Sequence, residues 1–494
     1  MSPSENAPLS SGRLSSGVPG LDEVLGGGLL RAGIYLVAGD PGAGKTLLAN
    51  QLCFHQARQG VRSLYVTLLA EPHARMFEHL KPMRFFDART VSDSVYYVSA
   101  FQVLESQGLA GLQELLRREM RQREAGLLVI DGLAQAREQA ASPREFKKFL
   151  HELQVSAHLS RFTALLLSTT AAEAQASPEQ AMVDGILELH ERTYGVRAQR
   201  ELRVRKFRGG ESLPGCHFFR ISDAGLELFP RLESRSHRQQ PVDPGAHRVH
   251  FGIASLDALF PEGLAAGSTT LLLGPTGSGK TLLGMSLLGE GLRLGEPCLY
   301  FGFYEPPDRL LNKVAKVGIA LHAAAETHRL ALHWQPPGEY VLDMLAARLL
   351  SAVRAQGARR VFVDGLSAFF DATTEPARLS LFFAGLTHEL RCLGATTAFA
   401  LETSQIFGPE LPVPVGSGIS AVAENLIFLR HVELKSRLHR LVSILKLRDT
   451  EYDTTLREFT ISSQTGIVVD GPFQGGEGVL TGVAHSSGGS SRHG

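Results

Sequence analysis

One glycine-rich segment occurs twice in this 494-residue chain and strongly limits the folds open to it. It reads GDPGAGKT at residues 39–46 and GPTGSGKT at residues 274–281, so that its two lysines lie 235 residues apart. Further landmarks recur in the same order at almost the same offset: LYVTLLAEPHARM and LYFGFYEPPDRLL, LLVIDGL and VFVDGLS, VRKFRGG and ILKLRDT. Ordered landmarks at one offset indicate a duplicated domain.

The duplication sets the expected domain boundaries. We expect one domain over residues 13–229 and a second over residues 249–470. Residues 230–248 are polar and contain proline, which is typical of a linker. The N-terminal residues 1–12 and the Gly/Ser-rich residues 471–494 are expected to be disordered tails.

Within each half, apolar runs of strand length alternate with helical stretches. In the first half the runs are GIYLVAG, SLYVTLL, GLLVIDGL and FTALLLSTT, separated by segments such as GLQELLRREMRQREA. This alternation predicts an α/β fold in each half, with a mainly parallel sheet flanked by helices on both faces. Ligands of such sheets lie at the carboxyl ends of the strands, where most of the repeated landmarks fall.

The repeated glycine-rich segments are expected to be phosphate-binding loops. Each follows a predicted strand and opens a helix, so backbone N–H groups and the helix N-terminus would hold a nucleotide triphosphate. Lys45 and Lys280 would reach the β- and γ-phosphates, and Thr46 and Thr281 would hold Mg²⁺. The full set of expected loop residues is Gly39, Asp40, Pro41, Gly42, Ala43, Gly44, Lys45 and Thr46, with Gly274, Pro275, Thr276, Gly277, Ser278, Gly279, Lys280 and Thr281.

An aspartate ends an apolar strand in each half. Asp131 ends LLVID and Asp364 ends VFVD. A carboxylate at the tip of a buried strand, next to the strand that leads into the phosphate-binding loop, is the expected partner of Mg²⁺. Strands often end in aspartate, but the two phosphate-binding loops favour the metal role here.

A glutamate follows the next strand in each half, Glu71 in AEPHARM and Glu305 in YEPPDRL. Such a carboxylate could orient or deprotonate the water that attacks the phosphate. The alternative is a solvated glutamate that opens a helix, since a proline follows each one. Local sequence does not separate the two, and the position after the strand favours catalysis.

Each half also carries a late Lys-x-Arg pair, Lys206 with Arg208 and Lys446 with Arg448. Inside a strand, residues two apart face one side, so each pair would present two cations together. A solvated strand face is the usual alternative. The repetition favours a pair that reaches the phosphate of a neighbouring subunit, which would make the protein a ring.

These motifs together resemble the KaiC family, the circadian-clock ATPase and its bacterial relatives within the RecA-like superfamily. The resemblance covers about residues 12–470 and rests on SGVPGLDEVLGGGL, the two GKT loops, the Glu-Pro turns, the Asp strands and the Lys-x-Arg pairs. It implies two RecA-like domains per chain, a hexameric double ring and ATP at the subunit interfaces. In that family the late Lys-x-Arg pair contacts ATP on the next subunit.

Two departures from the family pattern bear on activity. The family commonly has two adjacent glutamates after the second strand, whereas this chain has Ala70-Glu71 and Tyr304-Glu305, so hydrolysis could be slow. The clock proteins phosphorylate a Ser-Thr pair in the second domain. Here Ser420 is followed by Ala421, which leaves at most one acceptor for a serine autokinase and speaks against a two-site clock cycle.

Two other functions are alternatives to an ATP-hydrolysing ring. A RecA-like DNA recombination ATPase would need basic loops after the fourth strand, but residues 169–185 and 402–418 contain no Lys or Arg, which argues against nucleic acid. A scaffold assembled by ATP with negligible turnover stays open. No motif identifies a regulatory protein partner.

Composition bears on the compartment and on the partners. With 50 Lys+Arg and 50 Asp+Glu, the chain has no overall attraction to nucleic acid or an anionic membrane. The apolar runs are too short to span a membrane, and the N-terminus has no signal-peptide core. The scattered cysteines Cys53, Cys216, Cys298 and Cys392 are expected to be reduced, in the cytoplasm.

Overall fold

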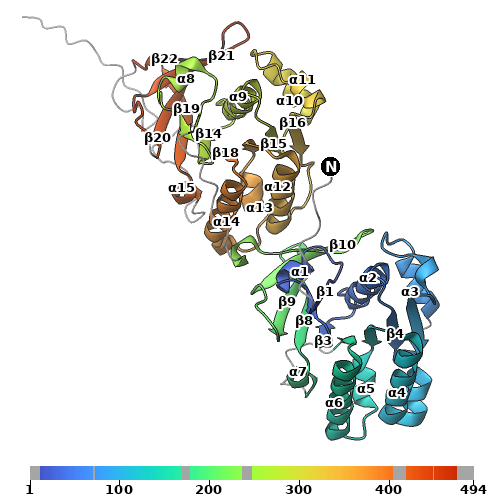
Figure 1. The fold of residues 1–494 in the computed structure, drawn as a ribbon. Coiled ribbons are helices and arrows are strands. Elements are labelled where there is room, and N and C mark those ends of the chain that lie inside the picture. Colours follow the sequence, from blue (N-terminus) through green and yellow to red (C-terminus); the bar gives the residue numbers. More distant parts are fainter. Residues whose placement is uncertain are drawn as a thin grey trace, which may run out of the picture. The chain divides into compact units, whose positions relative to one another are not determined.

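A computed structural model describes residues 12–70, 73–169, 178–235, 247–403, 419–434, 436–448 and 450–474. The chain divides into two compact units, residues 1–235 and 236–494, here called domain 1 and domain 2 (Figure 1). The predicted linker and the predicted disordered tails lie mostly outside the described residues, so both assignments stay predictions. Among the described residues, no helix is both long and apolar enough to cross a bilayer.

Domain 1 is built around a nine-stranded sheet in the order β11-β10-β9-β8-β3-β7-β6-β4-β5. The strands from β8 to β5 are parallel, and β9, β10 and β11 continue the sheet in antiparallel fashion. The strands are β3 Ile34–Gly39, β4 Ser63–Thr67, β5 Val95–Ser99, β6 Leu127–Asp131, β7 Thr163–Ser168, β8 Gly185–Tyr194, β9 Arg197–Phe207, β10 Cys216–Ser222 and β11 Gly225–Phe229.

Helices cover both faces of this sheet, as the strand–helix alternation predicts. All six residues of β3 are buried, because the parallel strands carry apolar side chains on both faces. One core cluster packs α2 on the sheet, and a second packs α4, α5 and α6 on it. The helices are α2 Lys45–Arg58, α3 His73–Leu80, α4 Phe101–Arg123, α5 Leu133–Glu138, α6 Pro143–Ser160 and α7 Pro178–Met182.

Domain 2 repeats this topology. Its sheet order, β16-β15-β17-β18-β14-β19-β20-β21-β22, places each strand where its counterpart lies in domain 1. The strands are β14 Thr269–Gly274, β15 Cys298–Gly302, β16 Leu330–Trp334, β17 Arg360–Asp364, β18 Thr396–Glu402, β19 Asn425–Leu434, β20 Arg437–Lys446, β21 Arg457–Ser462 and β22 Gly466–Pro472. The helices are α8 Ala254–Asp257, α9 Lys280–Arg293, α10 Pro307–Ala315, α11 His322–Glu326, α12 Leu342–Gln356, α13 Ser367–Asp371, α14 Leu379–Cys392 and α15 Ile419–Val422.

The strand order corrects one expectation. The strands that end in Asp131 and Asp364 do not lie next to the strands that lead into the phosphate-binding loops, because β7 and β18 lie between them. Strand order in a parallel sheet follows from the crossover connections, and all of these strands are similarly apolar. Sequence pattern therefore does not reveal which of them are neighbours.

The two domains hold their first segments in different ways. In domain 1, Gln56 on α2 donates a hydrogen bond to the carbonyl oxygen of Ser15 at 2.6 Å. The residue that corresponds to Gln56 in domain 2 is Gly291, and a Cβ there would lie 2.6 Å from Cδ of Arg360. Domain 2 thus has no glutamine side chain on this helix to donate the bond, and the side chain of Arg360 occupies the space beside Gly291.

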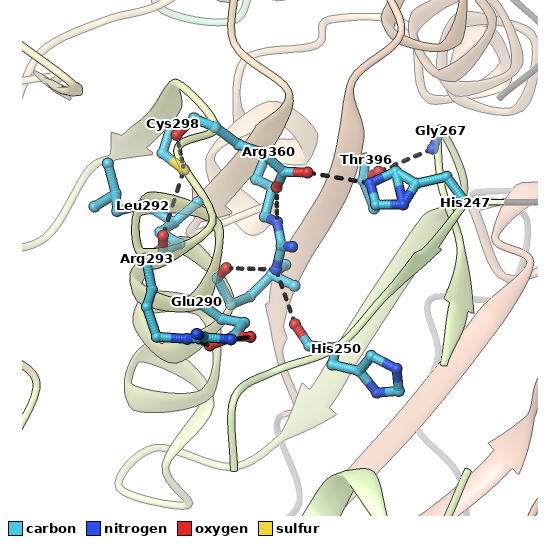
Figure 2. Close-up of polar contacts among 12 residues, drawn as sticks. His247, His250, Gly267, Glu290, Leu292, Arg293, Cys298, Arg360 and Thr396 are labelled. Atoms are coloured by element: carbon cyan, nitrogen blue, oxygen red, sulfur yellow. Dashed lines mark hydrogen bonds and ion pairs between the residues drawn. The ribbon is translucent and has the colours of Figure 1, made fainter. Parts of the chain in front are cut away.

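Arg360, at the start of β17, is 1% exposed and replaces that donor. Its Nη1 donates to the carbonyl oxygens of His250 at 2.8 Å and Leu287 at 3.1 Å, and its Nε is paired with Glu296. Figure 2 shows the guanidinium between helix α9 and the backbone of His250. His250 corresponds to Ser15, so the same carbonyl is held in both domains by different residues.

Candidate functional site: two phosphate-binding loops

The phosphate-binding loops have nearly the same geometry in both domains. β3 ends at Gly39 and α2 begins at Lys45, and β14 ends at Gly274 and α9 begins at Lys280, as the sequence predicts. The ammonium of Lys45 donates to the carbonyl oxygens of Gly39 at 2.7 Å and Asp40 at 2.8 Å. Lys280 makes the matching bonds to Gly274 at 2.7 Å and Pro275 at 2.8 Å.

The glycine before each lysine is required by the backbone. Gly44 and Gly279 precede the helices with φ of 103° and 106°, a left-handed conformation that glycine adopts without strain. A Cβ would also lie 3.0 Å from Cδ1 of Ile221 in domain 1 and 2.6 Å from Cε1 of Phe459 in domain 2. The late antiparallel strands thus pack directly against the loops.

The aspartates meet the helix threonines although their strands are not adjacent to the loop strands. Thr46 Oγ1 donates to Asp131 Oδ2 at 3.1 Å, and Thr281 Oγ1 donates to Asp364 Oδ2 at 2.9 Å. Burial raises the pKa of both aspartates, while these hydrogen bonds and the nearby lysines oppose the shift. In both domains, burial also lowers the pKa of the loop lysine, and the neighbouring carboxylates oppose this lowering.

The residues present fit a hard divalent cation. Each site pairs one hydroxyl oxygen with one partly desolvated carboxylate, which are ligand types that Mg²⁺ accepts, and Mg²⁺ keeps several waters and takes few protein ligands. A nearby cation would favour the charged carboxylate that burial disfavours. A bound Mg²⁺ would neutralise part of the negative charge on the phosphates.

Sequence reasoning missed a tyrosine that orients each aspartate. Tyr65 donates to Asp131 Oδ2 at 2.6 Å, and Tyr300 lies 3.5 Å from Asp364 Oδ2. Both tyrosines are fully buried. The signal was present in the repeat, because a Leu-Tyr pair stands at the same place in LYVTLL and LYFGFY.

Beside the loop of domain 1 lies a cavity of about 710 Å³. This volume is in the range of small-molecule sites. Loop residues and the first turn of α2 form one wall, and α3, the residue Met83 beyond it and β10 supply the remainder. Besides the loop, its lining residues are Leu47, Arg75, Met76, His79, Leu80, Met83 and Ile221.

The two candidate catalytic glutamates differ in what can be described. Glu71 lies outside the described residues. Glu305 follows β15 as expected, and its Oε1 accepts a hydrogen bond from Lys313 Nζ at 2.8 Å. The neighbouring Tyr304 bonds Ser367 through its hydroxyl at 2.8 Å and is 59% exposed. Partial desolvation raises the pKa of that phenol, so Tyr304 is no substitute for a carboxylate.

The Lys-x-Arg pairs lie away from their own phosphate-binding loops. Lys206 Nζ donates to the carbonyl oxygens of Gln180 and Ala181, both at 2.9 Å, and Lys446 Nζ donates to Ala423 at 2.7 Å. Burial and the adjacent arginine lower the pKa of each lysine. These contacts place the lysine tips at the edge of the sheet where the parallel strands begin.

That edge is opposite the one with the loop. The strand β14 runs five residue steps from Thr269 to Gly274, or about 16 Å at about 3.3 Å per residue. A pair at its start therefore does not reach a phosphate held at its end. One detail of the expectation was wrong: β9 ends at Phe207 and β20 at Lys446, so Arg208 and Arg448 lie just beyond the strands.

Two sequence predictions cannot be placed fully. Ser420 falls within α15, but its side chain lies outside the described residues. The loops weighed for DNA binding also lie largely outside them. All four cysteines are free thiols, as expected for reduced residues.

The fold and the loops define a class: each domain is a RecA-like P-loop nucleotide-binding domain. Comparison with known proteins narrows it. A sequence profile described as "ATPase: KaiC" matches residues 14–233 and 249–473, and the chain belongs to this family.

Similar full-length relatives carry circadian names. The chain is 27% identical to the circadian clock oscillator protein KaiC of Picosynechococcus sp., over 94% of this chain and 91% of the relative. It is 24% identical to the circadian clock protein KaiC3 of Synechocystis sp., over 95% of this chain and 94% of the relative. The similarity thus extends through both domains.

Proposed function

We propose that this chain is an ATP-hydrolysing ring protein that acts in bacterial signalling or regulation in the cytoplasm. The observation that carries the proposal is the repeated site, in which a loop lysine, a helix threonine and a strand aspartate converge in each domain. We expect ATP at both loops, with Thr46, Asp131, Thr281 and Asp364 holding Mg²⁺.

The positions of the Lys-x-Arg pairs support a ring. Because each pair lies at the edge opposite its own loop, it is available to a phosphate bound on another copy of the chain. An arginine supplied in trans stabilises the charge that develops during phosphoryl transfer. We expect a hexamer whose nucleotides lie between subunits.

Removing the loop lysines tests nucleotide binding. Lys45→Ala and Lys280→Ala each delete the cation from one loop, so each should reduce bound nucleotide from two per chain to one. The double variant should bind none and hydrolyse none. Nucleotide content after desalting and phosphate release with Mg-ATP measure both quantities.

Exposed lysines provide the matched controls for this experiment. Lys81→Ala and Lys316→Ala remove the same charge at surface positions of domain 1 and domain 2. They should leave occupancy and turnover unchanged. A single loop variant that still binds two nucleotides per chain would show that its loop is not a nucleotide site. Full occupancy with no phosphate release in the parent protein would favour the ATP-assembled scaffold.

Serine autokinase activity is the finer proposal for domain 2. It rests on the sequence position of Ser420 alone, since the described residues do not include that side chain. Incubation with Mg-ATP followed by mass spectrometry is expected to show phosphate on Ser420 that disappears in Ser420→Ala. An unmodified Ser420 in protein that hydrolyses ATP would leave a plain ATPase.

A further inference from the structure

In domain 2 a glutamate ends the strand beside the phosphate-binding loop, where domain 1 has a threonine. Glu402 ends β18, the strand immediately beside β14, and its register partner is Gly274 at the start of the loop. Its Oε1 accepts a hydrogen bond from the hydroxyl of Thr276, the third loop residue. The side chain is exposed at the carboxyl edge of the sheet, where ligands of parallel sheets bind.

The carboxylate expected from the sequence is engaged elsewhere. Glu305 is paired with Lys313, and its second oxygen is buried without a hydrogen-bond partner among the described residues. Its neighbour Tyr304 replaces the second glutamate common in the family and is bonded to Ser367. Of the two glutamates, Glu402 is the more exposed and the one bonded to the loop.

Domain 1 has no carboxylate at the register position of Glu402, and its nearest loop carboxylate, Asp40, belongs to the loop itself. Its corresponding strand, β7, pairs Ser168 with Ala38, so the next residue, Thr169, occupies the register position of Glu402. The loop residue that corresponds to Thr276 is Pro41, which has no hydroxyl to donate. The acceptor and the donor therefore occur together in domain 2 and are both absent in domain 1.

We propose that Glu402 is the general base that orients and deprotonates the attacking water in domain 2. The role rests on the ATP hydrolysis proposed above. The water oxygen forms a bond to the γ-phosphorus while the bond from that phosphorus to the β–γ bridging oxygen breaks. The electron pair leaves with ADP, and the proton of the water passes to Glu402 and then to solvent.

Isosteric substitution tests this role in the full chain. Lys45→Ala serves as the parent, because it confines nucleotide to domain 2. Adding Glu402→Gln should lower the single-turnover rate of ATP hydrolysis by about 10²-fold or more, while the Kd for a fluorescent ATP analogue changes by less than about threefold. Glu305→Gln should lower the rate much less. Glu326→Gln, on exposed α11, is the neutral control.

The outcomes distinguish a failure of the role of Glu402 from a failure of the proposed ATP hydrolysis. If the parent hydrolyses ATP and Glu402→Gln hydrolyses it equally fast, Glu402 is not the base, and domain 2 is still an ATPase. A large loss in Glu305→Gln alone would assign the role to Glu305. If the parent binds ATP and releases no phosphate, hydrolysis in domain 2 fails and the role of Glu402 fails with it.

Discussion

Replacing Arg360 with leucine is expected to lower the free energy of unfolding of domain 2 by about 3 kcal/mol. The substitution leaves the Glu296 carboxylate with His247 as its remaining partner, and the carbonyl oxygens of His250 and Leu287 lose the donor that Arg360 supplies. Buried polar groups that lose their partners carry the full cost of desolvation. Trp334, the single tryptophan of the chain, lies in domain 2 and reports this transition in urea.

The matched control transfers the arrangement of domain 1. The residues Gly291, Glu296, Cys298 and Arg360 correspond to Gln56, Val61, Ser63 and Leu127. A variant carrying all four domain 1 residues regains the helix donor and has no unpaired charge. It should unfold within about 1 kcal/mol of the parent, since a buried ion pair can be replaced by well-packed apolar groups at little cost. An Arg360→Leu variant as stable as the parent would refute the structural role of the pair.

Removing Lys446 and Arg448 is expected to slow turnover in domain 2 strongly while leaving its phosphate-binding loop intact. Lys446→Ala/Arg448→Ala should slow hydrolysis in domain 2 by about 10³-fold or more, as expected when an arginine in trans is lost. Nucleotide binding should persist, because the loop is intact. Phosphate release is measured in an Asp131→Asn background, which silences hydrolysis in domain 1.

Mixing two inactive variants tests whether the cations act in trans. Lys280→Ala subunits keep the pair and lose the loop, and Lys446→Ala/Arg448→Ala subunits keep the loop and lose the pair. In equal, randomly mixed hexamers about a quarter of the interfaces combine an intact loop with an intact pair, and activity should return to about that fraction. A mixture that stays inactive although the subunits exchange would show that the cations do not serve a neighbouring subunit.

The local parts of the site follow from sequence. GDPGAGKT and GPTGSGKT fix a strand, a loop and a helix start within a few residues, and the structure has each of them where the sequence predicts it. The meeting of Thr46 with Asp131 was also expected, because a bound metal requires it. The position of β7 between β3 and β6 was not expected, since β7 is as apolar as its neighbours and the sequence pattern does not reveal strand order.

Two residues escaped sequence reasoning because their surroundings are set by distant segments. Arg360 begins an apolar run, where an arginine usually marks a solvated strand end, and only the glycine at 291 makes room for its burial. Glu402 stands in a segment whose clearest sequence feature is its lack of Lys and Arg. Its contact with Thr276 depends on β18 pairing with β14, which joins residues far apart in the chain.

The carbonyl of Ser15 is bound by Gln56, whereas the corresponding carbonyl of His250 is bound by Arg360. This difference also restricts how the two halves of the gene can recombine. A recombination event within residues 64–126, or within the matching part of domain 2, would join Gln56 to Arg360 or Gly291 to Leu127. The product that combines Gln56 with Arg360 places two donors in space that fits one, since a Cβ at position 291 would lie 2.6 Å from Cδ of Arg360. The second has no donor at all. Gene conversion between the halves should therefore be tolerated only for tracts that replace residues 56 and 127 together or replace neither, which allows the two domains to diverge within an unchanged fold.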